Sequence, residues 1–187
     1  MAAQLRGAGD WLEVVPGIDS VVVRFDALAI SADDARKSLL AILDSGVRPI
    51  EPGDELVEIP VVYGGEFGPD LDELCARTGL SPDEVIAIHA GGEYVVEMTG
   101  FTPGFAFIGG LDERLQVPRR SEPRQRVPAG SVGIAGERTG LYAMASPGGW
   151  TLIGRTPMTL FDPGAEQPFV LAPGMRVRFR AARGDEQ

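Results

Sequence analysis

Arginines are concentrated in one part of this acidic chain, and they are the residues best suited to bind an anion. Residues 118–157 contain six arginines and only two acids, although the formal net charge of the chain is −10. A guanidinium group binds a carboxylate or phosphate through two parallel hydrogen bonds. Nearby prolines restrict the backbone, so we expect Arg119, Arg124 and Arg155 to contact a small anion or an acidic partner. The alternative is that they are solvated or pair with one of the two nearby acids.

Two glycines and a tryptophan in the same stretch favour a site for developing negative charge. Gly148 and Gly149 can present backbone N–H groups to an oxyanion. Trp150 is expected to form an apolar wall, although tryptophan in a small barrel is more often a core residue. Ser131 and Thr156 lie beside glycines and are further candidate substrate contacts. Neither has a visible triad partner, so a serine hydrolase mechanism gains little support.

Aromatic residues of the segment GFTPGFAF are the other candidates for a pocket wall. We expect Phe101, Pro103 and Phe105 to line the pocket. Phe107 continues the alternation of phenylalanines. Core packing is the alternative for at least two of the three phenylalanines.

His89 is the single histidine and the expected proton-transfer group, because its unperturbed pKa lies near neutrality. The alternative is a structural histidine near the C-terminus of a helix, packed beside Val85 and Ile88. Cys75 is the single cysteine, which rules out an intramolecular disulfide and a cysteine-based zinc cluster. We therefore expect no metal site.

Composition and absent motifs exclude several classes of function. A pI near 4.6 argues against nucleic-acid binding, which phosphate neutralisation drives. The sequence has no apolar run long enough to span a membrane and no apolar leader, so we expect a cytoplasmic protein. It contains neither GxxxxGK[ST] nor GxGxxG after a strand-like run, which excludes a P-loop and a simple dinucleotide site.

Hydrophobic spacing and turn residues predict an α+β chain in two domains. Residues 1–90 are expected to form an α/β domain and residues 91–187 a β-barrel, because helical spacing gives way to short strands between glycine and proline turns. Ser81 and Glu84 form the pattern of a capping box, with Pro82 at the first helical position. The other expected elements are a strand, turn and strand over 11–26, a helix over 31–45, an apolar run over 56–63, a helix over 70–78 and a last strand over 175–181.

Six segments, read in order, resemble one known family. They are IPVVYGGEFGPDL, EVIAIH, GFTPGFAFIGGL, VPRRSEPRQRVPAGSVGIAG, and SPGGWTLIGRTP with LFDP. Over roughly residues 11–180 the chain is similar to the family that includes allophanate hydrolase subunit 1, the sporulation kinase inhibitor and the B-type subunit of 5-oxoprolinase. The resemblance implies a small N-terminal α/β domain and a cyclophilin-like β-barrel. Family members usually have a further strand and helix before WLEVVPGIDSVVVRF, so we expect an incomplete N-terminal sheet or a true start upstream of Met1.

The resemblance also implies that the chain works together with partner polypeptides. The leading expectation is the B-type subunit of an ATP-dependent 5-oxoprolinase, which opens the cyclic amide of 5-oxoproline to glutamate. Its partners would be the C-type subunit, equivalent to allophanate hydrolase subunit 2, and an A-type subunit, and the ATP site would be shared with them. Half of a urea-type carboxyltransferase is an alternative, with biotin on another polypeptide. Inhibition of a histidine kinase is a second alternative.

Overall fold

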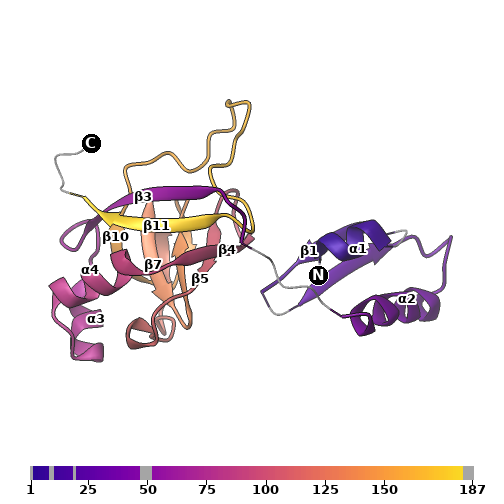
Figure 1. The fold of residues 1–187 in the computed structure, drawn as a ribbon, viewed down its shortest axis with the longest axis horizontal. Coiled ribbons are helices and arrows are strands. Elements are labelled where there is room, and N and C mark those ends of the chain that lie inside the picture. Colours follow the sequence, from indigo (N-terminus) through magenta and orange to yellow (C-terminus); the bar gives the residue numbers. More distant parts are fainter. Residues whose placement is uncertain (1, 9–10, 19, 47–51, 183–187) are drawn as a thin grey trace. The chain divides into compact units, whose positions relative to one another are not determined.

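The computed structural model describes residues 2–8, 11–18, 20–46 and 52–182 (Figure 1). The chain divides into two compact units, Met1–Glu51 and Pro52–Gln187.

The first unit contains a β-hairpin and two helices. Strands β1 (Trp11–Pro16) and β2 (Val21–Phe25) pair antiparallel, which confirms the predicted strand, turn and strand. The predicted helix is α2 (Ala32–Asp44), and Ser31 caps it by accepting a hydrogen bond from the Asp34 amide at 3.2 Å. Helix α1 (Ala2–Ala8) was not expected, because AAQLRGA has no acidic residue in its first turn to mark a helix start.

The second unit is a closed seven-stranded barrel with two helices beside it (Figure 1). The barrel order is β10-β3-β11-β4-β5-β8-β7, and β6 and β9 form a separate two-stranded ribbon. The α+β class with a β-barrel is therefore confirmed. The elements are β3 (Leu56–Tyr63), α3 (Leu71–Thr78), α4 (Pro82–Gly91), β4 (Tyr94–Thr99), β5 (Ala106–Gly109), a 3-10 turn (Glu113–Leu115), β6 (Arg124–Val127), β7 (Ser131–Ala135), β8 (Arg138–Leu141), β9 (Ser146–Gly148), β10 (Thr151–Arg155) and β11 (Arg176–Ala181).

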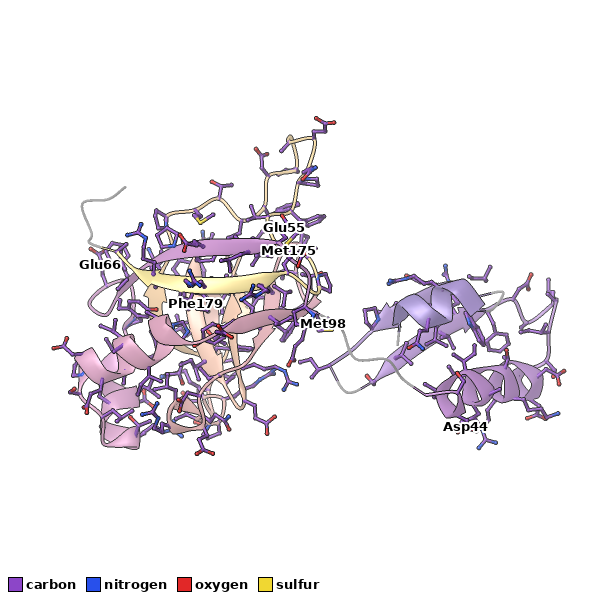
Figure 2. The ribbon with its side chains drawn as sticks, viewed as in Figure 1. Asp44, Glu55, Glu66, Met98, Met175 and Phe179 are labelled. Carbon is purple, nitrogen blue, oxygen red and sulfur yellow. The ribbon has the colours of Figure 1, made fainter. Side chains whose placement is uncertain are left out.

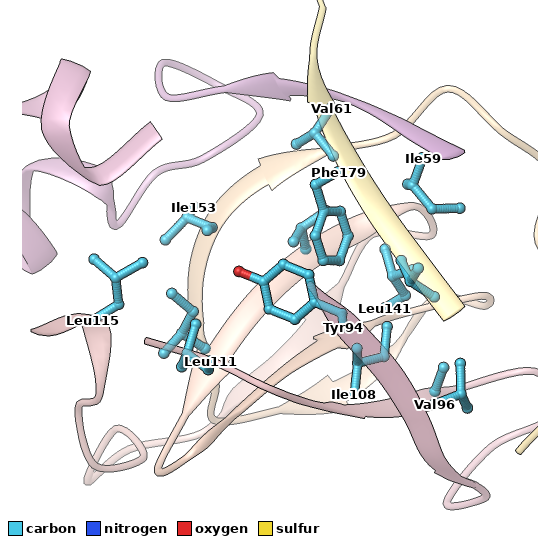
Figure 3. Close-up of a cluster of buried hydrophobic side chains, with 14 of the residues drawn as sticks. Ile59, Val61, Tyr94, Val96, Ile108, Leu111, Leu115, Leu141, Ile153 and Phe179 are labelled. Carbon is cyan, nitrogen blue, oxygen red and sulfur yellow. The ribbon is translucent and has the colours of Figure 1, made fainter. Parts of the chain in front are cut away.

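Strand β3 closes the barrel by pairing with two strands from the far end of the chain. It pairs parallel with β11, where Ile59 lies opposite Phe179, and antiparallel with β10. Glu55 and Glu66 flank this strand (Figure 2). Inward side chains of β3, β4, β5, β8 and β11 fill the interior (Figure 3), among them Val61, Tyr94 and Phe179. Period-two alternation between core and surface is what half-buried barrel strands require.

The predicted capping box sets the start of α4. The Ser81 hydroxyl accepts from the Glu84 amide at 3.3 Å, and the Glu84 carboxylate accepts from the Ser81 amide at 2.8 Å. These reciprocal bonds satisfy two amides that a helix start leaves without partners. Helix α4 contacts β11, and it carries His89 into the barrel interior.

The predicted domain boundary at residues 90 and 91 is wrong. The two compact units meet at residues 51 and 52, because β3 is a barrel strand and α3 contacts β10. Spacing identified β3 as an apolar run, but it could not show that its partner β11 lies about 120 residues further along the chain. The N-terminal unit is correspondingly smaller than expected.

A fragment of residues 52–187 should therefore fold without the first unit. We expect a single cooperative thermal transition followed by far-UV circular dichroism. A fragment of residues 91–187, cut at the sequence-based boundary, lacks β3 and leaves the edges of β10 and β11 unpaired. It should aggregate or unfold without cooperativity, and equal cooperativity of the two fragments would contradict the assignment.

Candidate functional site

The candidate site lies on the outer face of β7 and β8, where two glycines make room for a tryptophan. Gly133 and Gly140 are directly opposite each other in the β7–β8 pair. A Cβ atom would lie 2.9 Å from Trp150 at the first position and 2.8 Å from it at the second. Because real Cβ atoms need more space than this, only glycine lets the indole pack onto the strands.

Three further aromatic rings pack around this indole. Phe105 contacts Trp150 edge to face with ring centroids 5.6 Å apart, and it contacts Phe107 and Tyr142 at 4.7 and 4.8 Å. Beside them is a cavity of about 270 Å³. Its lining residues are Phe101, Phe105, Phe107, Arg119, Pro123, Tyr142, Pro147, Gly148, Gly149 and Trp150. The structure thus brings together six of the predicted site residues: Phe101, Phe105, Arg119, Gly148, Gly149 and Trp150.

Arg119 reaches this cavity because its neighbour is held in place. The Arg120 amide donates to the Gly149 carbonyl at 2.8 Å, and the Arg120 guanidinium contacts Asp70 and Glu73 at 3.2 and 3.1 Å. The exposed side chain of Arg119 then places its guanidinium 5.9 Å from the centre of the Trp150 ring. This distance is within the range of a cation–π contact.

Asp70 joins two parts of the basic segment to the barrel. Its side chain is 5% exposed and accepts hydrogen bonds from the Leu152 amide at 2.7 Å and from the guanidinium of Arg124 at 2.6 Å, besides the bond from Arg120. Arg124, a predicted anion contact, is therefore an ion-pair partner in this structure. The sequence suggested only the nearby acids as partners of Arg124, whereas Asp70 is 54 residues away.

The remaining predicted contacts lie outside the cavity. The Arg155 guanidinium lies over the Phe67 ring, 5.3 Å from its centre, and Arg155 is opposite Ser131 in the β7–β10 pair. Ser131 is 0% exposed, and Thr156 is 3% exposed and accepts from the Met158 amide. Pro103 lines a neighbouring hollow with Phe101. These residues stay predictions, but the structure does not group them with Arg119.

His89 lies inside the barrel, and both of its ring nitrogens are occupied by protein groups. The residue is 0% exposed, with Nδ1 2.7 Å from the Tyr63 hydroxyl and Nε2 3.0 Å from the Thr139 hydroxyl. Thr139 donates to the Gly133 carbonyl at 3.1 Å. Thr139 must therefore accept from Nε2–H, which leaves Nδ1 to accept from Tyr63.

This environment keeps His89 neutral. Burial lowers its pKa from 6.5 to about 3, and its ring packs on Phe179 with centroids 4.4 Å apart. The contacts favour the structural role over direct contact with a ligand, since the ring does not line the cavity and has no exposed atom surface to offer one. Proton transfer by His89 stays a prediction.

Tyr142 is a cavity residue that sequence reasoning missed. It lies just after β8 in the run LYAM, which has the pattern of an ordinary apolar strand. The spacing of two residues between Gly140 and Tyr142 could have identified Tyr142, because alternate residues of a strand lie on the same face. A Cβ atom on Gly148 would lie 2.2 Å from the Tyr142 hydroxyl, so glycine is needed there as well.

The comparisons with known proteins agree with the fold. The family model described as carboxyltransferase domain, subdomain C and D, matches residues 1–171. The chain therefore belongs to this family. Three curated relatives, each named as the B-type subunit of 5-oxoprolinase, are 41 to 45% identical. The relative from Escherichia coli O157:H7 matches 96% of this chain and 82% of its own length.

Solved structures give the same architecture. An uncharacterised protein of Pyrococcus horikoshii is 45% identical, with a TM-score of 0.69 over 98% of this chain and 85% of that one. Urea carboxylase of Kluyveromyces lactis is 20% identical, with a TM-score of 0.79 over 97% of this chain and 19% of that one, which shows likeness of fold alone. No helix among the described residues is long and apolar enough to cross a membrane.

Replacing Asp70 by Asn should destabilise the barrel unit by about 2–4 kcal/mol, because two guanidinium groups lose a buried negative charge. Chemical denaturation measures this difference. Glu73→Gln is the control, because the Glu73 side chain is 48% exposed and its ion pair with Arg120 should contribute less than about 1 kcal/mol. Equal small losses in the two variants would show that Asp70 is not a structural anchor.

Stability should depend on pH through His89. Between about pH 3 and 6.5 the unfolded chain binds a proton at this ring and the folded chain does not, so the free energy of unfolding rises with pH across this window. The contribution is up to about 1.4 kcal/mol per pH unit and levels off above the unfolded pKa. His89→Gln should lose this part of the slope in denaturation curves measured from pH 4 to 7. Identical slopes in the two proteins would mean that His89 is not buried in its neutral form.

Proposed function

We propose that this chain is the B-type subunit of an ATP-dependent 5-oxoprolinase, a heteromeric hydrolase that opens 5-oxoproline to glutamate. The observation that carries the proposal is 41 to 45% identity to three proteins named as this component of 5-oxoprolinase, over nearly the whole chain. A second support is the cavity, whose aromatic walls and single arginine suit a small cyclic amide bearing a negative charge.

The chemistry requires more than this chain offers. A lactam is stable, so its oxygen must be activated before water attacks the carbonyl. In this proposal ATP phosphorylates that oxygen. The sequence contains no P-loop. We therefore assign the nucleotide site to an assembly with the C-type and A-type subunits, in which this chain binds and orients the amide. Because the reaction consumes ATP, we also assign the proposed enzyme to the cytoplasm.

A urea-type carboxyltransferase is the second candidate, because the fold is shared with urea carboxylase. In that reaction the cavity would bind the amide acceptor, and biotin would arrive on another polypeptide. The low identity to urea carboxylase supports the fold only, whereas the relatives named as 5-oxoprolinase components are at least twice as similar in sequence.

Reconstitution tests the proposal. The purified chain is mixed with candidate A-type and C-type subunits, and release of glutamate from 5-oxoproline is measured with and without ATP. We expect turnover that requires ATP and disappears when this chain is omitted. A complex that assembles, shown by size-exclusion chromatography, yet releases no glutamate would contradict the proposal. Carboxylation of amides with a biotin carrier would then be the next assay.

A further inference from the structure

The cavity beside Trp150 has the features of a binding site for a small carboxylate with an apolar body. Its volume of about 270 Å³ suits a small ligand. Aromatic residues make up half of the lining, and Arg119, Tyr142, Gly148 and Gly149 are the lining residues that can supply a guanidinium, a hydroxyl and backbone N–H groups. A few polar groups in an apolar pocket fix the orientation of a ligand.

Arg119 is available to a ligand in a way that its neighbours are not. Arg120 and Arg124 share the buried carboxylate of Asp70, whereas Arg119 forms no ion pair with any residue in the described part of the barrel unit. Its guanidinium lies over the indole of Trp150, 5.9 Å from the ring centre. A cation–π contact does not use the paired N–H donors of a guanidinium in hydrogen bonds, so they can bind a planar carboxylate.

Tyr142 supplies a neutral donor beside this cation. The residue is 1% exposed, and burial raises the pKa of its hydroxyl to about 12. A hydrogen bond from the Trp150 backbone and the charges of Arg119 and Arg124 act in the opposite direction without reversing the shift. A phenol hydroxyl can accept one hydrogen bond and donate another, so the Tyr142 proton can serve an acceptor in the cavity.

The rim of the cavity carries an exposed aromatic ring. Phe101 is 67% exposed and has φ of +71°, a left-handed conformation that is rare for a bulky residue. Its ring meets Phe105 edge to face at 5.8 Å. Because Phe101 both lines the cavity and is exposed, we take this side as the mouth of the cavity.

We propose that Arg119 and Tyr142 bind the carboxylate of 5-oxoproline in this cavity, with the ring against Trp150 and the amide edge facing the mouth. The assignment rests on the proposed function. It makes Tyr142 a specificity-determining residue, and it explains how a chain without a P-loop presents the reacting amide to nucleotide held by its partners. The cavity binds the ligand through its carboxylate, and the lactam oxygen stays accessible for activation.

A pair of matched ligands tests the assignment. Calorimetry on the assembled complex measures dissociation constants for 5-oxoproline and for 5-oxoprolinamide, in which a neutral carboxamide replaces the carboxylate. Arg119→Gln should weaken binding of the acid by about 10- to 100-fold and of the amide by less than about 3-fold. Tyr142→Phe removes one oxygen atom and should weaken the acid by about 10-fold, again with less than about 3-fold effect on the amide.

Arg126→Gln is the control, because Arg126 is an exposed arginine of the same basic segment that does not line the cavity. It should leave both constants within about 2-fold of the wild type. If the wild-type complex turns over 5-oxoproline but both variants keep its preference for the acid, the assignment is wrong and the proposed function stands. If the wild-type complex neither binds nor turns over 5-oxoproline, the proposed function fails and the assignment fails with it. If the Arg119→Gln variant does not assemble with the partner subunits, binding by the Tyr142→Phe variant alone tests the assignment.

Discussion

The outer face of the barrel depends on the packing of Trp150 against two glycines that face each other across β7 and β8. A side chain at Gly133 or Gly140 would occupy the space of the indole. Overpacking of this kind typically costs about 1–3 kcal/mol and displaces the intruded group. Displacement of Trp150 would remove one wall of the cavity and the ring in cation–π contact with Arg119. The shape of the site therefore follows from the absence of two side chains.

Ion pairing with Asp70 determines which arginine of the basic segment lines the cavity. Asp70 is almost fully buried and accepts from Arg120, Arg124 and the backbone of β10, so it ties the basic segment to the barrel. A buried carboxylate with several donors costs less to desolvate than an isolated one. The same contacts hold the backbone beside Gly149, which leaves Arg119 over Trp150. Of the two adjacent arginines, Arg119 thus lines the cavity and Arg120 is an ion-pair partner of Asp70.

Local signals predicted the elements well and their long-range partners poorly. The capping box at Ser81 and the hairpin at Trp11–Phe25 depend on neighbouring residues, and both are present. Pairing of β3 with β11 joins distant segments, and no residue close to β3 in the sequence encodes it. The aromatic wall and Arg119 were predicted because they lie in one Gly- and Pro-rich stretch. Two predicted site residues lie away from the cavity for a shared reason: Arg124 pairs with the sequence-distant Asp70, and α4 turns His89 into the barrel, toward Phe179. Burial and cross-strand contacts of this kind cannot be read from spacing along one element.

A crystal structure of the assembled complex with 5-oxoproline and without ATP would show whether the cavity beside Trp150 binds the ligand. We expect density for the ring against Trp150, with the carboxylate within hydrogen-bonding distance of Arg119 and Tyr142. Ligand density elsewhere in the complex, with this cavity empty, would contradict it.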